Sequence, residues 1–505
     1  MNHRKKIIIL DLFVFLSLIL QTAFSSEVSS YLDDFEKRMT EFTLDNGMKF
    51  LVLERHDAPV VSFQTYVDVG SVNEVTGITG ISHIFEHMAF KGTSKIGSTN
   101  FKAESKAMDK IEKTFIALKD ERLKGDKADK VKLEQLEQQF KDAQQEADKY
   151  IAHDQFEKIL ESEGASGLNA YTGDDATYYI SSLPSNKLEL WMYMESNRFY
   201  DPVLREFYKE LNVIKEERRM GENYPTRKLL EDFLSIGFKA HPYGEPVIGH
   251  MSDLNSISME DASAYHEKYY IPANMTAAIV GDVDPEKVKE LAKIYFGRLP
   301  KEPKPEPVTT IEPPQEGERR VVLQEESQPL LLIGYHIPSF NNPDNVILET
   351  LANIISSGRT SRLYKSMVKE KKMAVSVTGM TDLPGDKYPA LFIFFVNPSR
   401  DHTNQECEEE IYSQLEKLKT EPVSEDELKK ARTSTKANLF RNLEWNSDLA
   451  SQLNYFQVIT GDWRNLFRRA EAIENVTAED IQRVAKQYFT VQNRTVGCIE
   501  TKKAQ

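Results

Sequence analysis

The segment Gly80–Thr93 reads G-I-S-H-I-F-E-H-M-A-F-K-G-T, and His83, Glu86 and His87 form the pattern H-x-x-E-H within it. If this segment is helical, histidines four residues apart lie on one face, one turn from each other. Two imidazoles in this placement can bind one tetrahedral metal ion, and zinc suits them best. Glu86 flanks the same face without being needed as a ligand. It is therefore free to accept a proton from an activated water molecule.

The alternative is a pair of surface histidines on an ordinary amphipathic helix. The rest of the segment is mostly apolar, so two unpaired histidines would be costly to bury there. The apolar residues are Ile81, Ile84, Phe85, Met88 and Phe90. The chain contains only 10 histidines, and a chance H-x-x-E-H is roughly a one-in-a-hundred event on composition alone. We therefore predict a metal site in this helix.

Composition and the first residues indicate an acidic, secreted protein. The 505 residues carry a net charge of −15, with 40% hydrophobic and 28% charged side chains. This balance suits a soluble core of two to four domains and argues against a nucleic-acid partner. Residues 1–25 have a basic start, the apolar run Ile7–Leu20 and the small-residue end Ala23–Ser25, which predicts a signal peptide. We expect export across the inner membrane to the periplasm, with no membrane span in the mature chain. An uncleaved membrane anchor is the alternative.

The residues before the metal segment favour an α+β layer. Residues 41–53 alternate polar and apolar side chains around Asn46-Gly47, a strong signal for a hairpin of two short strands. Pro59–Gly70 reads as a buried strand that ends at the loop before the metal helix. A strand, a loop and a helix with one apolar face form the first unit of such a layer.

From about residue 102 to 161 the composition changes to Lys, Glu, Gln, Asp and Ala. Two runs of apolar residues at helical spacing, broken at Gly125-Asp126, predict a helical hairpin with a narrow seam. The charged faces favour a solvated addition over a docking arm.

The chain repeats part of its own pattern. Five residues recur 219 positions later: Glu260, Asp261, Tyr269, Asn274 and Thr276 match Glu479, Asp480, Tyr488, Asn493 and Thr495. Earlier in each half, Gly92 corresponds to Gly358 at an offset of 266. The two offsets differ by 47, close to the size of the charged hairpin. The sequence therefore predicts one α+β domain that is duplicated, with the hairpin inserted into the first copy.

This duplication predicts the domain organisation. We expect a first domain over residues 26–299, a linker over 300–318 that is rich in proline, and a second domain over 319–505. The offset of 266 places Glu349, Ala352 and Asn353 opposite the H-x-x-E-H residues. The second copy has therefore lost the metal chemistry.

A two-histidine site needs a third protein ligand. The predicted helix over residues 206–220 carries Glu210 and Glu217, which are two helical turns apart and so share one face. Either carboxylate could complete the site, and Glu206 and Glu216 compete with them. Spacing alone does not choose among the four.

The motifs together resemble the pitrilysin/insulinase family of zinc metallopeptidases, whose H-x-x-E-H order is the inverzincin signature. The chain is most similar to the bacterial two-domain type that resembles the mitochondrial processing peptidase subunits. The resemblance covers nearly everything after residue 25. Its motifs are G-x-x-H-x-x-E-H-M-x-F-x-G-T at Gly80–Thr93, E-x-x-V-I-x-x-E from Glu210, N-A-Y-T at Asn169–Thr172, H-P-Y-G at His241–Gly244 and S-R-L-Y at Ser361–Tyr364.

The resemblance implies roles for particular residues. His83, His87 and Glu217 would bind Zn²⁺, Glu86 would be the general base, and Glu210 would be a supporting carboxylate of the catalytic site. The strand that holds Asn169, Ala170, Tyr171 and Thr172 would bind an extended peptide substrate, together with Phe90. An ordinary sheet edge is the alternative for that strand.

One departure from the family pattern concerns the second half. Active members often carry an Arg and a Tyr seven residues apart there, where this chain has Val368 and Val375. We therefore expect a partner chain of the same family to supply the Arg/Tyr pair in a heterodimer. Arg362 and Tyr364 are alternative donors within this chain.

The sequence as a whole predicts a zinc endopeptidase whose two homologous α+β halves close as a clamshell around a peptide. The second hypothesis is a scaffold or assembly subunit of a family heterodimer in which hydrolysis is weak. The zinc content of the purified chain distinguishes the two.

Overall fold

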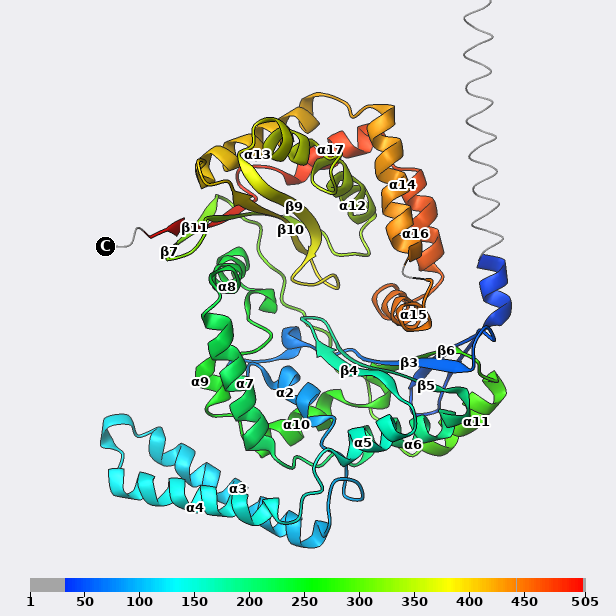
Figure 1. Ribbon diagram of the computed structural model, residues 1–505, viewed down its shortest axis with the longest axis vertical. Helices are drawn as coiled ribbons and strands as arrows, with labels where there is room; N and C mark the ends of the chain where they lie inside the picture. The colour runs from blue at the N-terminus through cyan, green and yellow to red at the C-terminus, as the bar shows by residue number, and fades with distance from the viewer. Residues whose placement is uncertain (1–31, 442, 503–505) are drawn as a thin grey trace, which may run out of the picture.

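Two mixed sheets, one in each half of the sequence, organise residues 32–441 and 443–502, which the computed structural model describes (Figure 1). The first sheet has the strand order β1-β2-β6-β3-β5-β4, and the second has the order β7-β11-β8-β10-β9. The predicted signal peptide, residues 1–25, lies outside the described residues. Among the helices of the described ranges, none is long and apolar enough to cross a membrane.

The first sheet contains the predicted hairpin. Strands β1 (Met39–Thr43) and β2 (Lys49–Glu54) pair antiparallel, and Gly47 adopts a φ of +98° at the turn between them. The remaining strands are β3 (Val60–Val67), β4 (Ser166–Thr172), β5 (Thr177–Pro184) and β6 (Met275–Gly281). Every residue of β6 is buried, since this strand lies between β2 and β3. Strand β4 pairs only with β5, so one edge of β4 is free of other described strands.

The second sheet repeats the order of the first, apart from the extra strand β1. Its strands are β7 (Arg319–Glu325), β8 (Leu330–Ile337), β9 (Ala374–Leu383), β10 (Ala390–Pro398) and β11 (Arg494–Thr501). Strands β2, β6, β3, β5 and β4 thus correspond to β7, β11, β8, β10 and β9. The predicted α+β fold of two homologous halves is confirmed.

Local contacts also repeat at the predicted offset of 219. Helices α10 (Met259–Tyr269) and α17 (Ala478–Tyr488) both begin with a capping box. The side-chain amide of Asn274 donates to the carbonyls of Asp68 and Tyr269. Asn493 donates in the same way to the carbonyls of His336 and Tyr488. Each asparagine ties the end of a helix to a neighbouring strand.

One helix from each half packs on the sheet of the other half. Helix α8 (Pro225–Gly237) packs on β7 and β11, and α15 (Asn446–Thr460) packs on β3 and β6 (Figure 1). Phe233 of α8 is fully buried in the core of the second half. Gly334 and Gly497 make room for it, because a Cβ at either would lie within 2.9 Å of the ring. This exchange fixes the two halves to each other.

The other helices cover the outer faces of the sheets and build the site. In the first half they are α2 (Ile81–Met88), α5 (Gln155–Ser162), α6 (Leu188–Tyr200), α7 (Phe207–Glu222), α9 (Met251–Leu254) and α11 (Pro285–Tyr295). In the second half they are α12 (Pro343–Ile355), α13 (Asn404–Thr420), α14 (Glu425–Arg441) and α16 (Asn465–Glu474). Residues 300–318 between the halves contain no helix or strand.

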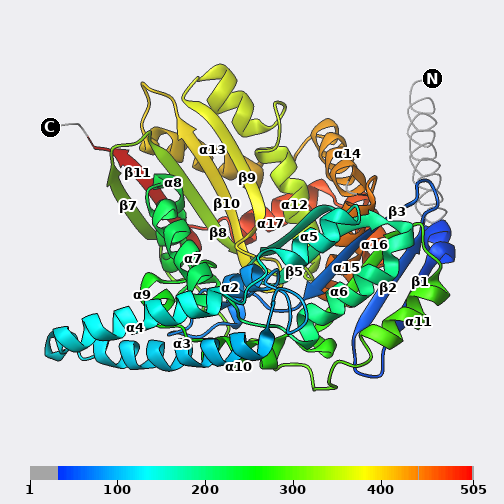
Figure 2. The ribbon, with the colours of Figure 1, turned by 60° about the horizontal axis from the view of Figure 1, so that its bottom comes forward.

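The charged segment forms a long antiparallel pair of helices, α3 (Phe101–Arg122) and α4 (Lys130–Asp148), that projects from the first half (Figure 2). Its base is buried: Ile111 and Phe115 belong to the core of the first half, and the Phe115 ring lies 4.2 Å from that of Tyr208 on α7. The interpretation of the whole hairpin as a solvated addition is therefore wrong for its base. Its tip is exposed at Leu123 and Val131.

Candidate metal centre and active site

Helix α2 divides its residues between the core and the site. Ile81, Ile84, Phe85 and Met88 are buried. His83, Glu86 and His87 are half-buried on the opposite side of the helix. The segment is helical because its apolar residues recur at helical spacing against the core of the first half. The three polar residues are thereby held together on one face, as the H-x-x-E-H spacing predicted.

The start of α2 is fixed by Glu74, a residue that sequence reasoning missed. Gly80 precedes the helix with a φ of +90°, and a Cβ there would lie 2.5 Å from the Ile248 carbonyl oxygen. A glycine offers no side chain to cap the helix. Glu74 takes that role, since its carboxylate accepts from the backbone N–H groups of Gly80 at 2.7 Å and Ser82 at 2.8 Å. The available signal in the sequence was an acidic residue, Glu74, six positions before a glycine that has no side chain to cap the helix.

Glu74→Gln is expected to weaken zinc binding while leaving most of the protein folded. The amide NH₂ of glutamine cannot accept from a backbone N–H, so one cap is lost, at a cost of about 1 kcal/mol or more. Because His83 lies in the first turn of α2, fraying there displaces a ligand. Zinc titration of the variant and of Glu245→Gln, an exposed carboxylate paired with His250, tests this. Equal zinc affinity in both variants would contradict it.

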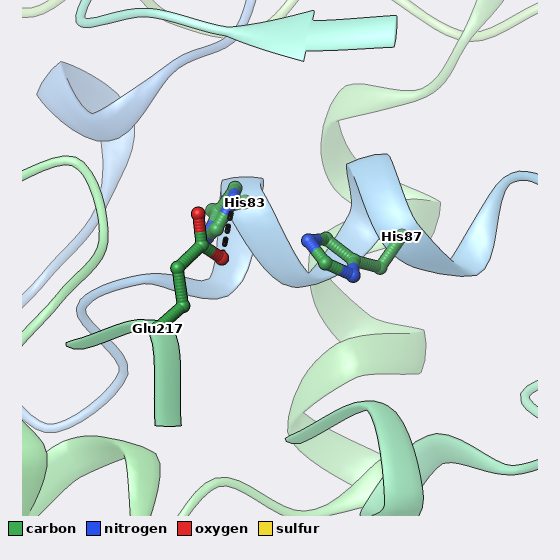
Figure 3. A group of neighbouring side chains, drawn as sticks. All are labelled: His83, His87 and Glu217. Atoms are coloured by element: carbon green, nitrogen blue, oxygen red, sulfur yellow. Dashed lines mark ion pairs between the residues drawn. The ribbon is translucent and has the colours of Figure 1, made fainter. Parts of the chain in front are cut away.

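His83, His87 and Glu217 form the group of described residues that could hold a metal ion, and their ligand atoms all lie within 4.8 Å of one another. The two imidazoles come from successive turns of α2, with ring centroids 4.9 Å apart. Glu217 reaches them from α7, and its Oε2 lies 3.8 Å from His83 Nε2 (Figure 3). The structure therefore brings together two of the residues of the H-x-x-E-H pattern and one of the four candidate carboxylates.

The other three carboxylates occupy different positions. Glu210 Oε2 lies 3.3 Å from His87 Nδ1, and Glu210 also pairs with Lys91 at 2.6 Å. Glu206 pairs with Lys91 and Lys209, and Glu216 is exposed and pairs with Arg219. Glu210 thus contacts the outer nitrogen of a histidine rather than the metal group. A carboxylate in this place fixes the tautomer and the orientation of a ligating imidazole.

Glu217→Gln is expected to weaken zinc binding more than Glu210→Gln does. Glu217 offers a ligand atom, whereas Glu210 acts through His87. Loss of such an outer partner costs about 10- to 100-fold in metal affinity, and loss of a ligand costs more. Competition with a chelator of known zinc affinity measures both variants. Equal losses would mean that Glu217 is not the third ligand.

The electrostatics suit a metal site with an acid–base group. Burial, with smaller contributions from the charges of His87 and Arg227, lowers the pKa of His83 to about 4. A neutral imidazole keeps the lone pair that a metal needs. Burial also raises the pKa of Glu86, against the opposing effects of Thr172 and His87. A carboxylate with a raised pKa is suited to accept and return a proton.

The residues fit a zinc ion. The 3.8 Å between His83 Nε2 and Glu217 Oε2 is too long for a hydrogen bond. It is close to the roughly 3.3 Å that separates two ligand atoms of one tetrahedral zinc. Two imidazoles and one carboxylate are the donors of many catalytic zinc sites.

A buried ion pair holds the loop after α2, and sequence reasoning missed it too. Arg205 is 2% exposed and donates to the carbonyls of Lys91, Thr93 and Ile96. Its charge is balanced by Glu104, which is fully buried at the base of the hairpin, 2.8 Å away. The hairpin base therefore stabilises the segment that leaves the metal helix. No local pattern connects residues 101 positions apart.

The predicted substrate strand is β4, at the edge of the first sheet. Asn169 and Tyr171 are exposed, and the Tyr171 ring stacks on Tyr178 at 4.3 Å. Ala170 is buried, as expected for alternation along a strand. Thr172 lies at the end of β4, next to Glu86 of α2. The free edge of β4 thus runs past the face of α2 that carries the histidines.

Phe90 lies just after α2 and is half-buried. The guanidinium of Arg198 lies 5.3 Å from its ring centroid, and also contacts the rings of Phe156 and Tyr179. Because Tyr179 pairs with Ala170 of β4, this buried cation connects the end of α2 to β4.

The second half holds no comparable group among the described residues. At the positions equivalent to the histidines, Glu349 pairs with Arg469 and Asn353 hydrogen bonds with Thr435. Val375 is 69% exposed at the start of β9. Arg362, one alternative donor, is held by Glu427 through two hydrogen bonds at 2.9 and 3.1 Å.

Comparison with known families agrees with this geometry. The chain matches the family model "Insulinase (Peptidase family M16)" over residues 49–117 and 143–250. It matches "Peptidase M16 inactive domain" over residues 256–435. The segment missing from the first match, residues 118–142, is the distal part of the hairpin.

Individual relatives show the same likeness. A protein named zinc protease PqqE from Helicobacter pylori is 28% identical over 94% of each chain. The crystal structure of a protease from H. pylori superposes with a TM-score of 0.76 at 26% identity, covering 92% of this chain and 99% of that one. The first half of the periplasmic protease PqqL from Escherichia coli shares the fold at 17% identity, with a TM-score of 0.67 and 92% of each chain covered.

Proposed function

Because the chain belongs to peptidase family M16, the insulinase family, we propose that it is a zinc-dependent endopeptidase that hydrolyses peptides or unfolded protein segments. The observation that carries this proposal is the grouping of His83, His87 and Glu217, with Glu86 on the same helix face. The name of the H. pylori relative, a zinc protease, supports the same chemistry.

A zinc ion bound by His83, His87 and Glu217 would supply the Lewis acidity that activates water and polarises the scissile carbonyl. Glu86 accepts a proton at its carboxylate as the water oxygen bonds to the carbonyl carbon. It then gives this proton to the nitrogen of the leaving amine as the C–N bond breaks. Glu210 keeps His87 oriented through its Nδ1.

The free edge of β4 is proposed to bind the substrate. An extended peptide can add to this edge through main-chain hydrogen bonds, with its side chains directed alternately to the two faces of the sheet. Asn169 to Thr172 and Phe90 would contact it. Because main-chain hydrogen bonds do not depend on side-chain identity, this mode suits unstructured peptides of varied sequence.

We also propose that full activity requires a partner chain of the same family that carries an Arg/Tyr pair. Val368 and Val375 offer no side-chain hydrogen bonds to hold the carbonyl side of a peptide, and Arg362 is engaged by Glu427. A peptide displaced by 1 Å from the attacking group can react about a hundredfold more slowly. The alternative role, a weakly active scaffold subunit, would suit a chain whose second half matches an inactive domain.

The proposed location is the periplasm. The pattern of residues 1–25 supports export. The E. coli structure that shares this fold is described as a periplasmic protease.

The test is to purify the chain, measure zinc by metal analysis and assay cleavage of unstructured peptides with and without candidate partner chains. We expect one zinc per chain, hydrolysis that a chelator removes and zinc restores, and a rise of about a hundredfold when the right partner is added. A zinc-free, inactive chain would favour the scaffold role. An unchanged rate per zinc with every partner would contradict the composite site.

A further inference from the structure

Arg227 stands beside the candidate metal centre without an ionic partner. It lies in the first turn of α8, and its side chain is exposed. Within the described residues, no carboxylate comes within 4.0 Å of its guanidinium, and it makes no side-chain hydrogen bond. Three cations close to it in sequence are paired: Arg218 with Glu222 and Glu231, Arg219 with Glu216, and Lys228 with Glu325. Arg227 differs from these three neighbours in having no carboxylate partner within the described part of the chain.

The position of Arg227 is set by the end of α7. Glu210, Glu217 and Gly221 are seven and four residues apart, so they lie along one face of that helix. The guanidinium lies over Gly221, where a Cβ would be 2.8 Å from Arg227 Nη1. Any other residue at position 221 would push the cation away. The side chain therefore extends the face of α7 that presents Glu217.

We propose that Arg227 binds a carboxylate of the peptide substrate and so determines specificity. A guanidinium presents paired N–H donors in a plane that matches a carboxylate, and two parallel hydrogen bonds fix its orientation. The inference rests on the proposed peptidase function. The carboxylate can belong to an acidic side chain or to the C-terminus of a short peptide, because both present the same group.

The distance to the site limits where that carboxylate lies. One helical turn from Glu217 to Gly221 is about 6 Å, and an extended peptide advances about 3.3 Å per residue. The group that Arg227 recognises is therefore about two residues from the scissile bond. A salt bridge at an exposed site is modest, so we expect a preference of about three- to tenfold.

The test compares pairs of quenched peptides that differ only by Glu or Gln at each of three positions on either side of the cleaved bond. A second series ends in a free carboxylate or an amide. The zinc-loaded protein is expected to prefer the carboxylate form about three- to tenfold, mainly through KM, with the preference declining as salt is added. Arg227→Gln should abolish the preference, Arg227→Lys should retain part of it, and Lys228→Gln, the adjacent paired cation, should retain all of it. A preference at an internal Glu assigns an acidic side chain, and a preference only in the second series assigns the C-terminus.

The same peptides titrated against Glu86→Gln, with and without Arg227→Gln, measure binding without hydrolysis. This arm separates the two failures. If the unmodified zinc-loaded protein cleaves none of the peptides, with or without candidate partner chains, while Glu86→Gln binds carboxylate peptides through Arg227, the peptidase function is refuted and the inference is supported. Equal Glu and Gln affinities, or a preference that survives Arg227→Gln, would overturn the inference. Loss of zinc in Arg227→Gln with the preference unchanged would assign the residue to the metal centre instead.

Discussion

Glu86→Gln is expected to remove nearly all peptide hydrolysis and to leave zinc binding and stability unchanged. The substitution keeps the size of the side chain but removes its ability to carry a proton. General acid–base catalysis by one positioned group contributes about 10²- to 10⁴-fold, and Glu86 is proposed to act twice in each turnover. Glu86 is not one of the three residues whose atoms are placed to hold the metal. The measurement is kcat on an unstructured peptide, together with zinc content.

Glu216→Gln is the matched control for this experiment. It removes a carboxylate from the neighbouring helix α7, where Glu216 is exposed and paired with Arg219. Its activity should equal that of the unmodified protein. Loss of zinc from Glu86→Gln would make Glu86 a ligand, and activity within about tenfold of the original would require a different general base.

The site was largely predictable because its chemistry is local in sequence. His83, Glu86 and His87 lie within five residues, and a helix converts that spacing into one face. The choice of Glu217 over Glu210 was not accessible from spacing, because both lie on the same face of α7. That choice depends on how α7 packs against α2, which places Glu217 near His83 and Glu210 near the outer nitrogen of His87.

The duplicated fold was predictable for a related reason. The match at an offset of 219 includes Asn274 and Asn493, whose side chains make equivalent hydrogen bonds in the two halves. Each asparagine links the end of a helix to a neighbouring strand, so the same residue recurs at the same junction in both halves. The exchange of α8 and α15 between the halves was not predictable, since their apolar faces could have packed on either sheet. The Phe233 ring fits against the second sheet because Gly334 and Gly497, on neighbouring strands, have no side chains there.

Two supports of the metal helix were missed because their partners are distant or unusual. Arg205 and Glu104 form a fully buried ion pair across 101 residues. In sequence, each residue reads as an ordinary surface charge, Glu104 in a helix and Arg205 in a turn, and only the fold shows that they are paired. Glu74 caps α2 from outside the usual N-cap position, across the turn that Gly80 requires.

Deletions in the helical hairpin are expected to have the second large effect, on folding, and this effect distinguishes the base of the hairpin from its tip. Replacing residues 107–152 by a Gly/Ser linker is expected to prevent folding of the first half. This deletion removes Ile111, Phe115, Ala143 and Ala147, all of which belong to its core. Loss of a buried Ile or Phe side chain typically costs about 2–5 kcal/mol each. The sum is comparable with the roughly 5–15 kcal/mol that stabilises a whole domain.

Replacing only residues 118–139 by a short Gly/Ser turn is expected to leave the protein folded, with Tm changed by less than about 4 °C. This variant keeps Phe115 and Phe140, which contact Tyr208. The buried Glu121 is removed together with its partners Lys124 and Lys132. Thermal unfolding followed by circular dichroism compares the two variants, with zinc content as a second readout.

If the variant that lacks residues 107–152 has the Tm of the intact chain, the base is not part of the core. If the variant that lacks residues 118–139 is unfolded, the tip contributes to stability. Glu104 lies at the base of the hairpin and holds Arg205 and the loop after α2. The short deletion leaves this base folded, so its metal site should stay intact.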